Sequence, residues 1–145
     1  MKWTATCRGS ACEPPLTYRL LPHTADIAAE LRAVDEPGLR AAGIEALREL
    51  LVGDSPVGAL AERPIEPRGA DAAERLVHFL GDVLYLYDTE RFVPARASPT
   101  GDGVAGEPFD PARHHAQREV KAVTYHGAEV RKEAEELVAT VIFDV

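Results

Sequence analysis

The sequence predicts a single α+β domain in which mostly antiparallel β-sheets pack against two α-helices. Two segments with helical periodicity, residues 35–53 and 71–88, lie among several short runs that alternate or are rich in β-branched residues. With 145 residues, 46% of them apolar, the chain can bury one core, and it shows neither repeat nor linker. We expect this domain to span residues 17–145, behind a flexible N-terminal extension of residues 1–16.

The first two strands are predicted to form a hairpin. Residues 17–21 are a short β-rich run, and residues 27–34 alternate between apolar and polar side chains, as a half-buried strand does. Residues 22–26, with the sequence Pro-His-Thr-Ala-Asp, are therefore expected to connect these strands.

Both predicted helices carry boundary signals. Asp35 stands where an N-cap belongs, Pro37 suits the first turn, and Gly53 can end the first helix. The second helix begins at Asp71, with Glu74 three residues later as in a capping box.

The other segments are predicted to supply strands and their connections. In chain order they are an edge strand (62–68), a strand (91–97), a turn-rich link (98–105), a strand (119–126), a solvated acidic turn (127–136) and a buried strand (137–145).

The composition argues against several classes of function. Asp and Glu number 24 against 16 Lys and Arg, for a net charge of −8, whereas binding to phosphate backbones favours a basic surface. No apolar run approaches the roughly 20 residues of a membrane span, and the first residues lack the apolar core of a secretory signal. We therefore expect a cytoplasmic protein that binds neither DNA nor membrane and meets RNA only through a partner.

An aspartate near the end of the last apolar run is the most informative single residue. A buried carboxylate such as that of Asp144 needs a partner, a cation or an exposed strand end. Together with the terminal carboxylate of Val145 it provides hard oxygen donors, which Ca²⁺ or Mg²⁺ prefers. A further carboxylate must come from elsewhere, and Asp26 is the candidate. Solvation of Asp144 and an ordinary turn-forming role for Asp26 remain open alternatives.

The residues offer little support for other chemistry. The histidines at 78, 114, 115 and 126 lack the HxxxH or HExxH spacing of zinc sites. No serine lies in a G-x-S-x-G elbow, and no glycine-rich phosphate loop opens a helix. The residues alone thus indicate an α+β domain with a candidate acidic metal site.

Several segments together resemble the archease family. They are residues 22–26 (PHTAD), residues 106–114 with Gly-Glu, Phe-Asp and a histidine, residues 119–126 (EVKAVTYH), and the closing Phe-Asp-Val of residues 143–145. The resemblance covers roughly residues 17–145, although the stretch between residues 92 and 106 is several residues shorter than is usual in the family.

The resemblance implies a non-catalytic accessory protein for RNA ligases of the RtcB type. Such ligases join a 2′,3′-cyclic or 3′-phosphate end to a 5′-hydroxyl end through a ligase-histidine–GMP intermediate. The accessory protein promotes guanylylation and repeated turnover in tRNA splicing or RNA repair. The two aspartates with which the family binds a divalent metal correspond to Asp26 and Asp144, and the carboxylate of Val145 would be a co-ligand.

The end of the domain that carries these carboxylates would then enter the active site of the ligase. Nearby residues would line the surface that faces the ligase. These residues would be His23, Glu107, Glu119, Lys121, Thr124 and His126, for which cross-strand pairing in a sheet is the alternative.

Two other functions stay open. A chaperone or specificity modulator of a tRNA-modifying enzyme, such as a methyltransferase, would bind its partner independently of the metal. A metal-dependent phosphoesterase would need a base or phosphate-holding cation beside Asp26, and only Lys121 is evident.

Overall fold

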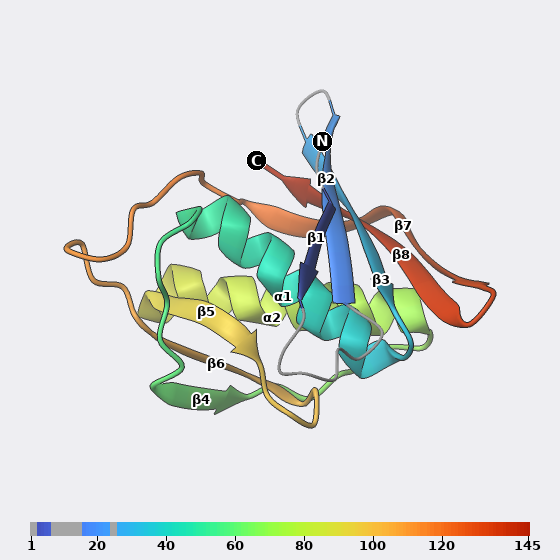
Figure 1. Cartoon of the computed structure of the whole chain (residues 1–145), viewed down its shortest axis with the longest axis horizontal. Helices are drawn as coiled ribbons and strands as arrows, with labels where there is room; N and C mark the ends of the chain where they lie inside the picture. Colours follow the sequence, from blue (N-terminus) through green and yellow to red (C-terminus); the bar gives the residue numbers. More distant parts are fainter. Residues whose placement is uncertain (1–2, 7–15, 24–25) are drawn as a thin grey trace.

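The computed structural model describes residues 3–6, 16–23 and 26–145, which form helices and strands in one α+β arrangement (Figure 1). In chain order the elements are β1 (Trp3–Thr6), β2 (Leu16–His23), β3 (Asp26–Ala33), α1 (Glu36–Val52), β4 (Ala61–Pro64), α2 (Ala72–Glu90), β5 (Phe92–Ala97), β6 (Gly103–Pro108), β7 (Ala122–Glu133) and β8 (Glu136–Asp144).

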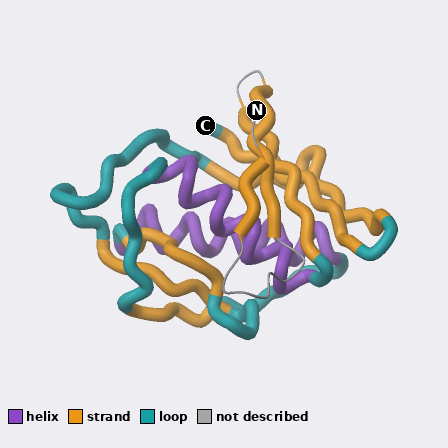
Figure 2. The backbone as a smooth tube through the Cα atoms, in the orientation of Figure 1, coloured by secondary structure: helices purple, strands orange, loops and turns teal. Residues whose placement is uncertain are grey.

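The strands make two antiparallel sheets that share the two helices. The larger sheet has the order β1-β2-β3-β8-β7, and the smaller one has the order β4-β6-β5. Helix α1 contacts β2, β3 and β8 of the larger sheet and β5 of the smaller one, while α2 contacts β7 and β5. The helices also contact each other, so both sheets are joined through them (Figure 2). The predicted fold class is confirmed.

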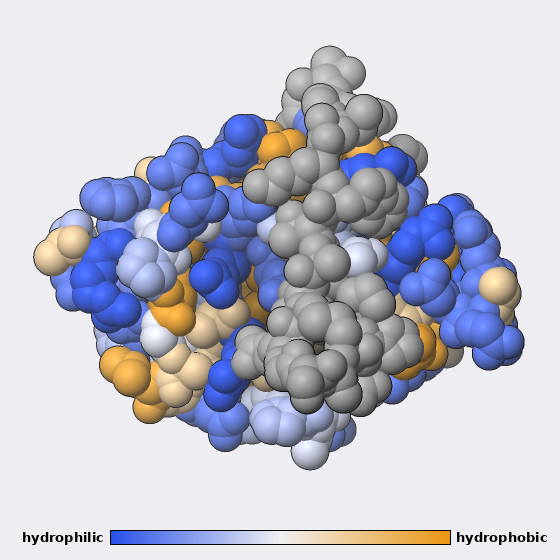
Figure 3. All heavy atoms as spheres, viewed as in Figure 1, coloured by the Kyte–Doolittle hydropathy of each residue, from blue (hydrophilic) through white to orange (hydrophobic). Residues whose placement is uncertain are grey.

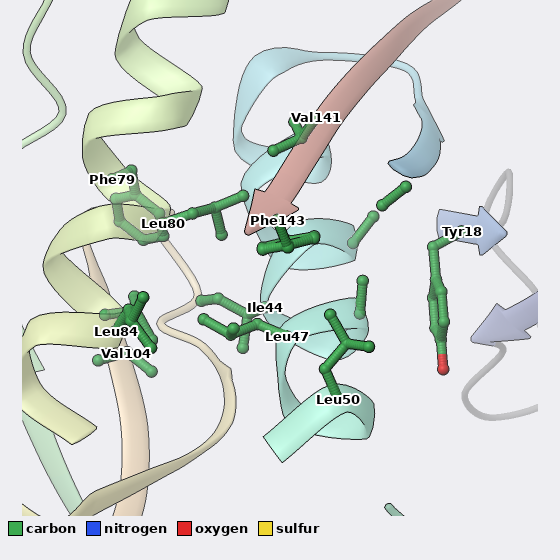
Figure 4. Packing of buried hydrophobic residues seen from close by; sticks show 14 of the residues in the cluster. Tyr18, Ile44, Leu47, Leu50, Phe79, Leu80, Leu84, Val104, Val141 and Phe143 are labelled. Atoms are coloured by element: carbon green, nitrogen blue, oxygen red, sulfur yellow. The ribbon is translucent and has the colours of Figure 1, made fainter. Parts of the chain in front are cut away.

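Strand alternation places the core on one face of the larger sheet. In β3 the fully buried residues Leu31 and Ala33 alternate with half-exposed ones, and in β8 Val141 and Phe143 do the same. Phe143 lies among buried side chains of α1 and α2 (Figure 4). The intervening positions, which include Asp26 at the start of β3 and Asp144 at the end of β8, therefore face away from the helices.

The predicted start of each helix and the end of the first are confirmed, while α2 continues two residues past the predicted end at residue 88. Asp35 accepts a hydrogen bond from the amide of Gly38 at 2.8 Å, and Asp71 accepts one from the amide of Glu74 at 2.8 Å. Gly53 ends α1 with a φ of 59°, and its amide donates to the carbonyl of Glu49 at 2.9 Å.

The link predicted for residues 98–105 is wrong in its second half, because Gly103 begins strand β6. Gly103, one of the glycines that suggested a turn, allows close contact between strands instead, and Gly106 in the same strand does so too. A Cβ on Gly103 would lie 2.7 Å from the carbonyl oxygen of Arg63, and one on Gly106 would lie 2.0 Å from that of Val93.

The acidic turn predicted for residues 127–136 is also wrong. Strand β7 continues to Glu133, and only residues 134–135 form the turn to β8. The charges follow the two-residue period of a strand: Arg131 donates to Glu129 at 3.0 Å and to Glu133 at 2.7 Å. The strand expected at residues 119–126 accordingly starts later, at residue 122.

The N-terminal prediction needs one correction. Residues 3–6 were expected to belong to a flexible extension, but they form β1 at the edge of the larger sheet, paired with β2. Residues 7–15 lie outside the described part of the chain, and so does the tip of the predicted hairpin at residues 24–25. The hairpin itself is confirmed, since β2 and β3 pair up to the residues that flank this tip.

The view in Figure 3 shows mostly hydrophilic side chains among the residues that are coloured. Neither of the two helices found in the described residues is long and apolar enough to cross a membrane.

Candidate metal centre

The two aspartates predicted as metal ligands lie directly opposite each other on neighbouring strands. Asp26, the first residue of β3, is the register partner of Asp144, the last residue of β8. Directly opposite residues of an antiparallel pair project to the same face, with Cβ atoms about 4.5–5.5 Å apart. Both side chains are half-buried on the face away from the helices. Two carboxylates in these positions repel each other unless a cation lies between or beside them.

Further oxygen and amide groups surround this pair. Asp144 is also the register partner of Ala122, and its backbone carbonyl accepts a hydrogen bond from the amide of Lys121 at 2.7 Å. The adjacent Val145 is half-buried and packs against the core. This packing and the hydrogen bond hold the end of β8 in place.

No protein cation neutralises the aspartates among the side chains that the structure describes. The ion pairs there link other residues, and neither aspartate takes part in one. A set of three or more His, Cys, Asp and Glu side chains suited to a metal is likewise absent from the described residues. The candidate donors are thus the carboxylates of Asp26 and Asp144, with that of Val145 as the predicted third. This oxygen-only set fits Ca²⁺ or Mg²⁺, which complete their shells with water.

Three of the residues expected near the site lie in or just before β7, the strand that pairs with the end of β8. Glu119 and Lys121 are exposed and lead into β7, and Thr124 lies in β7 opposite Ile142 of β8. The backbone of His23 is in register with Asp26, but its side chain and that of His126 lie outside the described part of the structure.

Glu107 does not lie on the surface where it was expected. It belongs to β6 in the smaller sheet and only 3% of it is exposed. Its carboxylate accepts hydrogen bonds from the amide of Gly58 and from Arg113, the latter at 2.5 Å. Nε2 of the buried His114 lies 3.4 Å from the other carboxylate oxygen, Oε2. Glu107 therefore has a structural role, in which it joins the loop before β4 to the loop after β6.

The hydrogen bond from Gly58 lowers the pKa of Glu107; burial opposes this shift and Arg113 adds to it. Because the pKa of Glu107 is lowered in the folded state, its carboxylate stabilises the fold at pH values above the ordinary pKa of 4.5. This stabilisation is lost as the pH falls through the lower pKa of the folded state. We expect Glu107→Gln to cost about 2–4 kcal/mol at pH 7 and clearly less in strong acid, as measured by thermal unfolding. The control Glu62→Gln, at an exposed position in β4, should change little. An equal loss for Glu107→Gln at both pH values would contradict this assignment.

Comparison with known proteins places the chain in a family. The model of the archease protein family matches residues 18–145. The chain belongs to the archease family. It is 33% identical to an archease of Archaeoglobus fulgidus and 33% identical to an archease of Methanopyrus kandleri, in each case over 90% of this chain and the whole of the relative.

Solved structures have the same fold as this archease-family chain. Protein 1598 of Methanobacterium thermoautotrophicum superposes with a TM-score of 0.70 at 27% identity, covering 88% of this chain and 98% of the other. An archease of Thermotoga maritima, described as a possible chaperone, superposes with a TM-score of 0.60 at 20% identity, covering 95% and 100%. At that lower identity the likeness shows the fold alone.

Proposed function

We propose that this archease-family chain is a non-catalytic accessory protein of an RtcB-type RNA ligase, and that it binds a divalent cation through Asp26 and Asp144. The observation that carries the proposal is the direct opposition of these two carboxylates at one end of the larger sheet. Family membership supports the accessory role, and the Thermotoga maritima relative is itself described as a possible chaperone.

Each residue at the end of the larger sheet that carries Asp26 and Asp144, here called the acidic end, would have its own role. Asp26 and Asp144 hold the cation, and the carboxylate of Val145 adds a third oxygen donor. The amide of Lys121 fixes the backbone of Asp144, while the exposed side chains of Glu119 and Lys121 are free to meet the ligase. When bound, Ca²⁺ or Mg²⁺ would supply positive charge for phosphate groups at the ligase active site.

Thermal unfolding with and without Ca²⁺ or Mg²⁺ tests the metal site without the ligase. A cation that binds only the folded state stabilises it by about 2.7 kcal/mol at a hundred times its Kd. We expect the wild type to show this gain and Asp144→Asn to lose it. Without metal, the Asn variant should be no less stable than the wild type, because a like-charge repulsion is removed. Asp88→Asn, at an exposed position of α2, is the matched control and should retain the gain. Equal metal responses in all three proteins would exclude this site.

Multiple-turnover ligation with the RtcB-type ligase of the same organism tests the accessory role. We expect the wild type and Asp88→Asn to stimulate turnover, and Asp26→Asn and Asp144→Asn to lose the stimulation by about tenfold or more. A folded wild type without effect would contradict the ligase role. Full stimulation by both aspartate variants would contradict the metal mechanism. Metal-independent binding to a tRNA-modifying enzyme would favour the modulator alternative, and hydrolysis of a phosphate ester by the chain alone would favour a phosphoesterase.

A further inference from the structure

Strand β7 has an irregularity close to the acidic end of the sheet. Its first residues, from Ala122 to Thr124, pair with the end of β8, and the register then shifts before pairing resumes at Glu129. Bulges of this kind bend a strand and redirect its side chains, and they are common beside functional sites. The paired segment of residues 122–124 is short and flanks Asp144. Contacts outside the β-ladder are therefore important for holding this segment in position.

Tyr125 provides such a contact, because it follows this segment directly and reaches α2. The phenol oxygen of Tyr125 is hydrogen-bonded to Nε2 of His78, and the two rings meet edge to face with centroids 5.4 Å apart. The contact is made although 51% of Tyr125 is exposed. It ties the irregular part of β7 to the second helix, which also contacts β7 elsewhere.

The hydrogen-bond directions follow from the partners. Nδ1 of His78 lies 3.0 Å from the backbone carbonyl oxygen of Arg68, which can only accept, so Nδ1 carries the proton. In neutral His78, Nε2 is then an acceptor and the hydroxyl of Tyr125 donates to it. Desolvation raises the pKa of Tyr125, with the Glu74 carboxylate adding to the effect and Arg68 opposing it, so the phenol keeps its proton.

The residue that orients His78 is itself fixed. Arg68 donates two hydrogen bonds to Asp82 of α2, at 2.6 and 3.3 Å. A continuous set of contacts therefore leads from α2 through Arg68 and His78 to Tyr125.

We propose that the contact between Tyr125 and His78 is a clamp that positions the acidic end of the sheet. It holds the start of β7 against α2, and the amide of Lys121 in turn holds the backbone of Asp144. Tyr125 and His78 are thus positioning residues for the cation-binding carboxylates. This inference rests on the proposed function for its biological meaning, but the clamp can be tested on the chain alone.

Amide hydrogen exchange measured by NMR on the full chain tests the clamp. We expect Tyr125→Phe, which removes only the hydroxyl, to accelerate exchange at Lys121 and in residues 122–124 by about tenfold, with unchanged exchange in α1. Tyr85→Phe is the matched control, since Tyr85 is a more exposed tyrosine of α2, at 65%. His78→Phe should act like Tyr125→Phe. His78→Gln should restore slow exchange in part, because its amide can accept from Tyr125 and donate to Arg68. Wild-type exchange in Tyr125→Phe would overturn the clamp.

The ligation assay then separates the clamp from the accessory role. At saturating accessory protein, Tyr125→Phe should give lower maximal stimulation than wild type, between those of Tyr85→Phe and Asp144→Asn. Faster exchange with undiminished stimulation would overturn the positioning role. A wild type that fails to stimulate the ligase would contradict the proposed function, while the exchange data would still decide whether the clamp exists.

Discussion

Gly106→Ala is expected to cost about 3–4 kcal/mol and to leave little folded protein at 37 °C. A Cβ at this position would lie 2.0 Å from the backbone carbonyl oxygen of Val93 and 3.0 Å from the ring of Phe92. Because the nearer atom belongs to the backbone of β5, no side-chain rotation relieves the clash, and β5 must separate from β6. Chemical denaturation monitored by circular dichroism measures the loss.

Gly81→Ala is the matched control for this prediction. Gly81 lies inside α2, and a Cβ there meets nothing within 4 Å. Alanine has the higher helix propensity, so this variant should be stabilised by up to about 1 kcal/mol. If Gly106→Ala were as stable as Gly81→Ala, the close approach of β5 and β6 would be wrong.

Phe143→Ala is expected to cost about 3–5 kcal/mol, the range for a large core side chain that leaves a cavity. Phe143 is fully buried between the larger sheet and the helices, near Leu80 of α2 and Ile44 of α1 (Figure 4). Its side chain also anchors the end of β8 directly before Asp144. We therefore expect this variant to weaken the cation response together with the fold, as measured by thermal unfolding with and without Ca²⁺.

Phe143→Leu separates packing from the site. It retains most of the buried volume, so its cost should stay below about 1.5 kcal/mol and its cation response should equal that of the wild type. A loss for Phe143→Ala no larger than that for Phe143→Leu would show that β8 is not held by this packing.

Local signals predicted the elements whose boundaries depend on a few neighbouring residues. The caps at Asp35 and Asp71 are examples, since a side-chain oxygen that bonds to an amide three residues later needs no distant partner. The apolar run that became β8 was equally clear, because a strand buried on one face and flanked by others is rich in β-branched residues.

The errors arose where tertiary contacts outweigh local preference. Gly103 was placed in a turn-rich link, yet it lies in β6 and allows this strand to approach β4 closely. Residues 129–133 read as a solvated turn, although their charges pair along one face of β7. Glu107 stood in a family motif and was expected on the surface, but the sequence gives no sign of its distant partner Gly58.

The sequence by itself determined the α+β class, both helices, the closing strand and the identity of the two aspartates as candidate ligands. Only the tertiary structure decided that Asp26 and Asp144 are register partners, because 117 residues lie between them and strand pairing is set by the packing of the opposite, apolar faces. The same holds for the contact between His78 and Tyr125, which joins a helix to a strand across the fold. The residue types that can bind a cation are thus visible in the sequence, whereas burial of the core brings these residues together.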